Sequence, residues 1–212
     1  ICAAQARGLT PRGGVPVGYE VAKALDAPLD ILLVRKIGAP FHAELAAGAV
    51  VDGTDPVTVV NEDVLAAYGI DASWIEEEGR RQLREIERRR KVYGTGRSPV
   101  PVAGRTVVVV DDGIATGATT RAALRALRQQ GVGRLVLATP VAPPDTLEDL
   151  RRECDETVAV LVPRWMGGVG ACYRNFRQLD DAEVVTILDR AATEQAERAG
   201  PPASPASADA RR

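Results

Sequence analysis

The 212-residue sequence has few of the side chains from which metal centres and disulfide scaffolds are built. Its three cysteines, Cys2, Cys154 and Cys172, lie far apart without a CxxC spacing, and His42 is the single histidine. Structural zinc sites need four such ligands, and disulfide scaffolds need paired cysteines. The low counts argue against both kinds of site, and they favour a reducing, cytoplasmic setting.

A charge excess and long apolar runs are also missing. The chain has 27 Lys plus Arg against 29 Asp plus Glu, so no basic excess indicates a nucleic-acid or anionic-membrane partner. Proline or charge interrupts the apolar runs well before the length of about 20 residues that a membrane-spanning helix needs. No basic-then-apolar leader opens the sequence. We therefore expect neither a nucleic-acid nor a membrane partner.

What the sequence does contain is an alternation of strand-like and helix-like segments. The expected helices are 15–25, 71–91, 120–130, 145–153 and 182–192, and the expected strands are 30–37, 106–110, 134–139 and 157–162. Two β-branched runs flank Asp-Gly-Thr-Asp-Pro within 49–60, which predicts a hairpin or a pair of edge strands. The alternation predicts an α/β fold with an open, mainly parallel sheet flanked by helices.

Domain organisation follows from length and composition. With 45% hydrophobic residues, the chain is long enough to bury one core, and we expect a single domain over residues 1–195. The small, polar, proline-rich end of the sequence (GPPASPASADARR) predicts a disordered tail over 196–212. The segment before Arg12 (ICAAQARGLTP) is a poor strand by its residue types.

The most informative stretch is VVVVDDGIATGATT, which begins at Val107. A glycine-containing turn from a parallel strand into a helix offers backbone N–H groups and a positive dipole to a phosphate. The stretch lacks the lysine of a P-loop and also lacks GxGxxG, so ATP or NAD is not indicated. Two carboxylates, Asp111 and Asp112, beside a phosphate cradle suit the vicinal hydroxyls of a sugar phosphate. The plainer alternative is a solvated strand end with a helix cap.

Four hydrophobic residues, two acids and a Gly/Thr loop resemble the phosphoribosyl-pyrophosphate (PRPP) signature of type I phosphoribosyltransferases. The resemblance implies an open parallel sheet with a small hood and a flexible loop. It also implies that Asp111 and Asp112 contact the ribose and hold Mg²⁺ indirectly, through ribose hydroxyls or water. The residues implied to bind ribose 5-phosphate are Gly113, Ile114, Ala115, Thr116, Gly117, Ala118 and Thr119.

Other segments extend the resemblance. PRGGVP, VRKIGAP and GxxYRNF together resemble a little-characterised bacterial branch of the family. The implied pyrophosphate-binding residues are Arg12, Gly13, Gly14, Arg35 and Lys36. The charge run 76–101, with its narrow apolar stripe, resembles the flexible loop, and Arg90, Lys91 and Tyr93 are its weaker candidates; a solvated helix face is the alternative. Tyr173–Phe176 falls where the family has its hood, and Tyr173 and Trp165 are candidates either for packing or for stacking on a base.

The resemblance implies transfer of ribose 5-phosphate from PRPP to a nitrogen acceptor such as a nucleobase, with release of pyrophosphate. Asp111, Asp112, Arg12 and Lys36 would be the catalytic residues, Mg²⁺ the cofactor and a homodimer the assembly. Ala115 stands where 6-oxopurine enzymes carry an acid. This difference weakens only the prediction of a 6-oxopurine acceptor. A PRPP-binding sensor without catalysis is the alternative, and a phosphatase or kinase on a similar sheet is a remote third.

Overall fold

A computed structural model describes residues 2–7, 13–53, 56–93 and 100–199. The described strands form one seven-stranded sheet in the order β4-β3-β2-β1-β5-β6-β7. The strands are β1 (Cys2–Arg7), β2 (Leu29–Ala39), β3 (His42–Val51), β4 (Val57–Val60), β5 (Thr106–Val110), β6 (Arg134–Val141) and β7 (Glu156–Leu161). The helices are α1 (Gly14–Ala24), α2 (Glu62–Tyr68), α3 (Ala72–Tyr93), α4 (Ala118–Gln129), α5 (Pro144–Leu150), the short 3₁₀ helix η1 (Val169–Cys172) and α6 (Asp181–Ala199).

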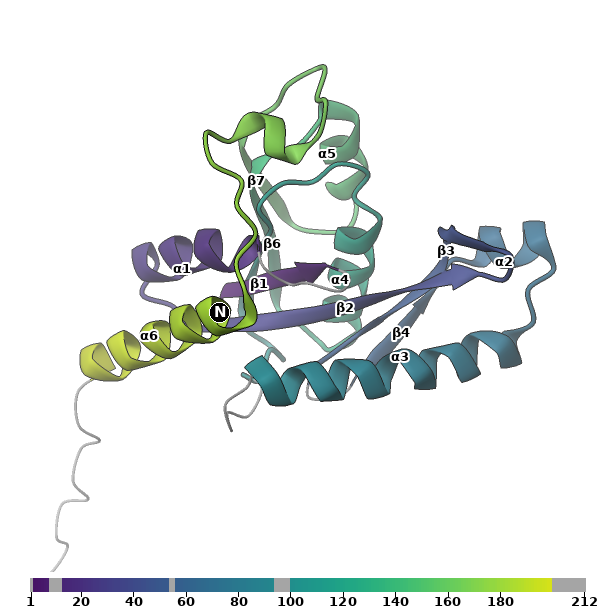
Figure 1. Cartoon of the computed structure of the whole chain (residues 1–212), viewed down its shortest axis with the longest axis horizontal. Helices are drawn as coiled ribbons and strands as arrows, with labels where there is room; N and C mark the ends of the chain where they lie inside the picture. The colour runs from purple at the N-terminus through teal and green to yellow at the C-terminus, as the bar shows by residue number, and fades with distance from the viewer. Residues whose placement is uncertain (1, 8–12, 54–55, 94–99, 200–212) are drawn as a thin grey trace, which may run out of the picture.

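The sheet has a parallel part and an antiparallel edge. Strands β2, β1, β5, β6 and β7 are parallel neighbours, which confirms the predicted architecture. The predicted hairpin is also confirmed, because β3 and β4 pair antiparallel with Val51 opposite Val57. Strand β3 is longer than expected and adds a second antiparallel pairing, to β2. This edge extends the sheet beyond the parallel strands (Figure 1).

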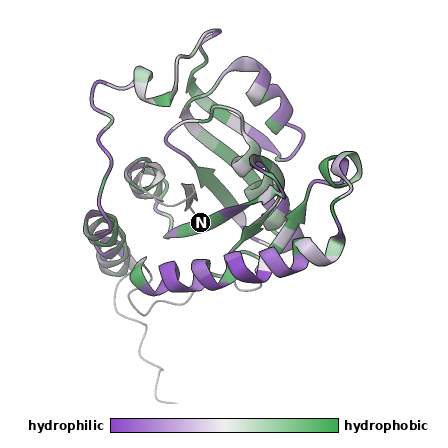
Figure 2. Ribbon diagram, turned by 45° about the vertical axis from the view of Figure 1, so that its right-hand side comes forward, coloured by the Kyte–Doolittle hydropathy of each residue, from purple (hydrophilic) through white to green (hydrophobic). Residues whose placement is uncertain are grey.

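Helices cover both faces of the sheet. Helices α4 and α5 pack against a core that includes Leu32, Val109 and Leu137, whereas α1, α3 and α6 pack against Ile31, Leu33 and neighbouring residues on the opposite face. The strands are mostly apolar, and α3 turns a hydrophilic side to solvent (Figure 2). Within the described ranges, none of the helices combines the length and the apolar character needed to cross a bilayer.

Strand β1 forms where the residue types favour a strand poorly. It pairs in parallel with β2 on one side and with β5 on the other. The backbone groups of a central strand are satisfied by both neighbours, and this tertiary pairing outweighs a weak intrinsic preference. The pairing also sets Ala4 of β1 level with Val110 at the end of β5.

Helix α3 contains most of the charge run and packs firmly on the sheet. Ile75, Ile86 and Tyr93 are buried, and so are Gly79 and Gln82 between them. The buried face of residues 72–93 is therefore wider than the narrow apolar stripe of the sequence indicates. Gly79 and Gln82 widen the buried face, although neither belongs to the apolar stripe of the sequence.

Helix α6 continues beyond the predicted start of the tail at residue 196. It runs to Ala199, and Arg190, Glu194 and Arg198 form ion pairs at i, i+4 spacing along it. Arg198 also contacts Asp26 after α1 at 3.1 Å. Such pairs add a few tenths of a kcal/mol each to a helix end. Residues 200–212 of the predicted tail lie outside the described residues.

Candidate functional site

The acid pair lies at the point where the connections between the parallel strands reverse direction. Chain connections lead from β1 to β2 on one side and from β5 to β6 on the other, and ligands of open α/β sheets bind at the carboxyl ends of such strands. Asp111 and Asp112 follow β5 directly. The Asp111 carboxylate is buried and accepts a hydrogen bond from the Asp112 N–H at 3.0 Å. The pair is therefore fixed at a place suited to a ligand.

The loop after the acids is anchored on one side and open on the other. Ile114 is buried, and its N–H donates to the Val141 carbonyl oxygen at 2.9 Å. The Thr146 hydroxyl donates to the Ala115 carbonyl oxygen at 2.8 Å. Ala115, Thr116 and Ala118 are nevertheless exposed. The first N–H groups of α4 have no acceptor within the helix, and they follow an anchored loop with exposed residues, which is an arrangement that can bind a phosphate.

Gly117 is needed for the backbone turn before α4 and for the packing of α5. It caps α4 with a φ of 71°, a conformation that side chains with a Cβ rarely adopt. A Cβ there would lie 3.0 Å from Thr146 Cγ2 and 3.2 Å from Leu150 Cδ1. The glycine therefore allows the backbone turn and the close packing of α5.

A cleft of about 370 Å³ opens beside the acid pair. We call it the hood cleft, because one wall is the hood, the segment 163–180 between β7 and α6. Gly13 and Gly14, both implied pyrophosphate binders, lie on another wall with Asp111 and Asp112. A Cβ on Gly13 would lie only 1.7 Å from Asp112 Oδ2, so the two loops are in close contact. The structure thus brings together three segments that are far apart in sequence.

Tyr173 links the hood to the acid pair. Its hydroxyl donates a hydrogen bond to the Asp112 carbonyl oxygen, and its ring lies 5.1 Å from the Phe176 ring, centroid to centroid. Burial, and then the negative charges of Asp112 and Asp111, raise the pKa of Tyr173 to about 12. The phenol therefore remains a hydrogen-bond donor at neutral pH. Trp165, by contrast, is exposed and packs into no core cluster of the described residues.

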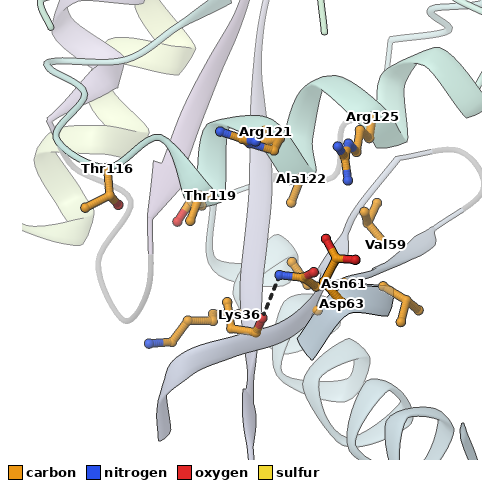
Figure 3. Close-up of a pocket in the computed structure, with 14 residues that line it drawn as sticks. Lys36, Val59, Asn61, Asp63, Thr116, Thr119, Arg121, Ala122 and Arg125 are labelled. Atoms are coloured by element: carbon orange, nitrogen blue, oxygen red, sulfur yellow. Dashed lines mark hydrogen bonds between the residues drawn. The ribbon is translucent and has the colours of Figure 1, made fainter. Parts of the chain in front are cut away.

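A second cleft, of about 310 Å³, lies on the other side of the loop and shares no lining residue with the hood cleft. We call it the α4 cleft, since the first half of α4 forms one wall and the β2–β3–β4 edge the other. Figure 3 shows Thr116 and Thr119 at one end, Arg121 and Arg125 along α4, and Lys36 on the opposite wall. The sequence reasoning missed both arginines; their i, i+4 spacing directly after the loop was the available signal.

Two adjacent residues of β2, Arg35 and Lys36, point to opposite faces of the sheet. Lys36 lines the α4 cleft, whereas Arg35 Nε donates to Gln82 Oε1 of α3 at 3.0 Å. Burial, and then the charge of Arg89, lower the pKa of Arg35. Successive side chains of a strand alternate between faces. The structure therefore does not bring this implied pair together.

The flexible-loop candidates also lie away from the phosphate loop. Arg90 Nε donates to Asp52 Oδ2 at 2.9 Å, and Gln130, just after α4, donates to the Asp52 carbonyl oxygen at 3.2 Å. The 12 residues of α4 separate this end from the phosphate loop by about 18 Å. Tyr93 is buried and donates to Asp181, and Lys91 is exposed. Arg12 and residues 94–99 lie outside the described residues.

Comparisons with known proteins agree with this site. A model of the phosphoribosyl transferase domain matches residues 10–177. The crystal structure of TT1426 from Thermus thermophilus superposes with a TM-score of 0.76 at 41% identity, covering 88% of this chain and 85% of that chain. Two Mycobacterium tuberculosis proteins, MT0597 (strain CDC 1551 / Oshkosh) and Rv0571c (strain H37Rv), are provisionally named phosphoribosyl transferases and are each 48% identical over 187 residues. The match covers 88% of this chain but 42% of each of these relatives, so the chain spans less than half their length. The chain therefore belongs to the phosphoribosyl transferase domain family.

Proposed function

We propose that this chain transfers the ribose 5-phosphate group of PRPP to a nitrogen acceptor and releases pyrophosphate. The observation that carries the proposal is the position of the acid pair. Asp111 and Asp112 stand between an open phosphate cradle and the hood cleft, with Gly13 against Asp112. A sugar phosphate needs a phosphate site with hydroxyl acceptors next to it, and the family membership supports the same ligand.

In the proposed complex, each part of PRPP has its own set of residues. The 5-phosphate binds to the loop from Gly113 to Thr119, where backbone N–H groups and two threonine hydroxyls are donors. Asp111 and Asp112 accept hydrogen bonds from the ribose hydroxyls. The residues proposed for pyrophosphate are Arg12, Gly13 and Gly14, of which the two glycines line the hood cleft, and Lys36, which lines the α4 cleft instead. Arg35 is a weaker candidate than the sequence suggested, because it faces α3.

The two acids also suit Mg²⁺. The described residues contain no cluster of three or more His, Cys, Asp or Glu side chains that would enclose a metal ion. Mg²⁺ is commonly held by one or two carboxylates together with substrate phosphates and several waters. Asp111 and Asp112 fit this mode, directly or through ribose hydroxyls and water. When bound, the ion would neutralise part of the charge on the leaving pyrophosphate.

The chain's own residues would supply charge control and exclusion of water. As the bond from C1 to the pyrophosphate oxygen breaks and the bond from C1 to the acceptor nitrogen forms, positive charge develops on the ribose. The fixed carboxylates would stabilise that charge. The hood, held to Asp112 through Tyr173, would limit hydrolysis of PRPP. Ala115 offers only a methyl group, so the loop provides no proton acceptor at that position.

The decisive experiment is incubation with PRPP, Mg²⁺ and a panel of nitrogen bases, followed by mass spectrometry of the products. A nucleotide with stoichiometric pyrophosphate is the expected result, and it would also identify the acceptor. Tight PRPP binding without turnover on any base would favour the sensor alternative. Absence of PRPP binding would contradict both.

A cytoplasmic location and a single domain over 1–195 remain predictions.

Tyr173→Phe should loosen the hood while leaving its packing intact. The substitution keeps the ring on Phe176 and removes only the hydrogen bond to Asp112, which is worth about 1 kcal/mol. We expect faster amide hydrogen exchange across 163–180 and a roughly fivefold lower kcat/KM. Tyr68→Phe on exposed α2 is the matched control. Equal exchange in the two variants would show that the hydroxyl does not position the hood.

A further inference from the structure

Strand β7 ends the sheet, and its outer edge is apolar. Among the described strands it pairs only with β6. Val160 is 87% exposed, and Val158 before it and Leu161 and Val162 after it are about half exposed. Trp165, just beyond the strand, is 93% exposed. Large apolar side chains thus gather along a strand that has unpaired backbone groups.

Proteins protect strand edges with lysine, proline, a bulge or a covering helix. The strand sequence ETVAVL contains no lysine or proline, and the described pairs with β6 keep one register from Glu156 to Leu161, without a bulge. The first proline, Pro163, comes after the strand. Ala159 packs toward the α4–α5 core, but Val158 and Val160 belong to none of the core clusters in the described part of the chain. An edge of this kind is a site for addition of another strand.

The charges around β7 favour a second copy of the same strand. Asp155 and Glu156 stand at its beginning, and Arg164 stands after its end. Antiparallel pairing of two identical strands places the beginning of each beside the end of the other. The acidic end of each copy therefore meets Arg164 of the other copy, twice in one symmetric interface. Parallel pairing would instead place like charges together.

Existing ion pairs do not compete strongly with this arrangement. Asp155 pairs with Arg128 and Glu156 with Arg134, both at 2.7 Å, but the side chains in both pairs are between one third and three fifths exposed. Exposed pairs of this kind contribute about 0–1 kcal/mol and rearrange readily. Arg164 makes no ion pair with a described residue within 4.0 Å, so its charge is available.

We propose that β7 pairs antiparallel with β7 of a second copy, which joins the two sheets edge to edge in a two-fold symmetric dimer. Backbone hydrogen bonds give the register, the exposed valines and Trp165 supply apolar area, and the Glu156–Arg164 contacts select the antiparallel direction. The hood follows β7 directly, so both hoods lie next to this interface. The proposal is independent of the reaction proposed above.

The first test is the mass of the chain in solution. Sedimentation velocity up to about 100 µM should show a species of twice 22.5 kDa, because a dimer with a Kd of about 1 µM would then be almost completely formed. Val160→Lys should raise the dissociation constant at least about tenfold, since lysine protects strand edges. Phe41→Lys, at a fully exposed apolar residue between β2 and β3, is the matched control and should leave the dimer unchanged. A wild-type chain that stays monomeric would overturn the proposal.

A charge exchange tests the orientation. Glu156→Arg and Arg164→Glu should each weaken the dimer by roughly tenfold or more, since each places like charges in contact twice. An equimolar mixture of the two variants should restore it as a heterodimer, because both contacts are complementary again. The loss in the single variants tests the orientation, because parallel pairing already places like charges together and neither exchange would weaken it. Failure of the mixture to associate, with both variants folded, would contradict the antiparallel pairing.

Discussion

Replacing both Asp111 and Asp112 by asparagine is expected to lower the affinity for PRPP by at least about 100-fold, since a hydrogen bond to a charged group is worth about 1.5–3 kcal/mol. The amide keeps the shape of the carboxylate, so both new side chains should fit the same space. The N–H of residue 112 can still donate to the amide oxygen of residue 111, as it now does to the carboxylate. Calorimetry with PRPP and Mg²⁺ measures the loss.

A control must separate loss of the ribose contacts from a general change of charge. Asp145→Asn removes one carboxylate at an exposed position on α5 and should leave PRPP affinity unchanged. Thermal unfolding of all variants establishes that they are folded. Unchanged affinity in the double variant would end the assignment of the ribose to the acid pair. Loss of PRPP affinity with retained binding of inorganic phosphate would support separate phosphate and ribose sites.

The second large effect is on stability. Arg90→Ala should lower the free energy of unfolding by about 3–5 kcal/mol at pH 8, because it leaves a buried carboxylate without its cation. Asp52 is 2% exposed, and its carboxylate accepts hydrogen bonds from the Arg90 guanidinium at 2.9 Å and from the Leu33 N–H at 2.8 Å. Denaturant unfolding measures the difference. Arg88→Ala is the control, because the exposed Arg88–Glu85 pair contributes little.

The loss of stability in Arg90→Ala should increase with pH. Burial raises the pKa of Asp52 from 3.8 to about 7, although the charge of Arg90 acts to lower it. A carboxyl with a raised pKa binds its proton more tightly when folded, so its contribution to stability falls as the pH rises from about 4 to about 7. Removal of Arg90 raises that pKa further. The cost of Arg90→Ala should therefore be smaller at pH 5 than at pH 8, and an equal cost at both would contradict the assignment.

Much of the fold could be predicted because its signals are local. The parallel strands and most helices follow from periodicity, and the hairpin follows from its turn residues. The phosphate loop is also local, because a buried strand, two acids and a helix start are consecutive in the sequence. Strand β1 and the docking of α3 could not be predicted in this way. Strand β1 forms because it has a pairing partner on each side. Helix α3 docks through a buried face that includes Gly79 and Gln82.

The order of elements, the position of the acid pair and the family resemblance can be read without the structure. Helices and strands appear as local hydrophobic periodicity, and the acid pair belongs to one continuous motif. Which distant residues meet depends on the tertiary structure. Tyr173 reaches Asp112 across 61 positions, and Arg90 reaches Asp52 across 38. Such contacts depend on how strands are ordered and which face each helix covers, and no local pattern specifies either. For this reason the sequence predicts the loop after β5. It does not predict the hood contact, the separation of Arg35 from Lys36 or the exposed edge of β7.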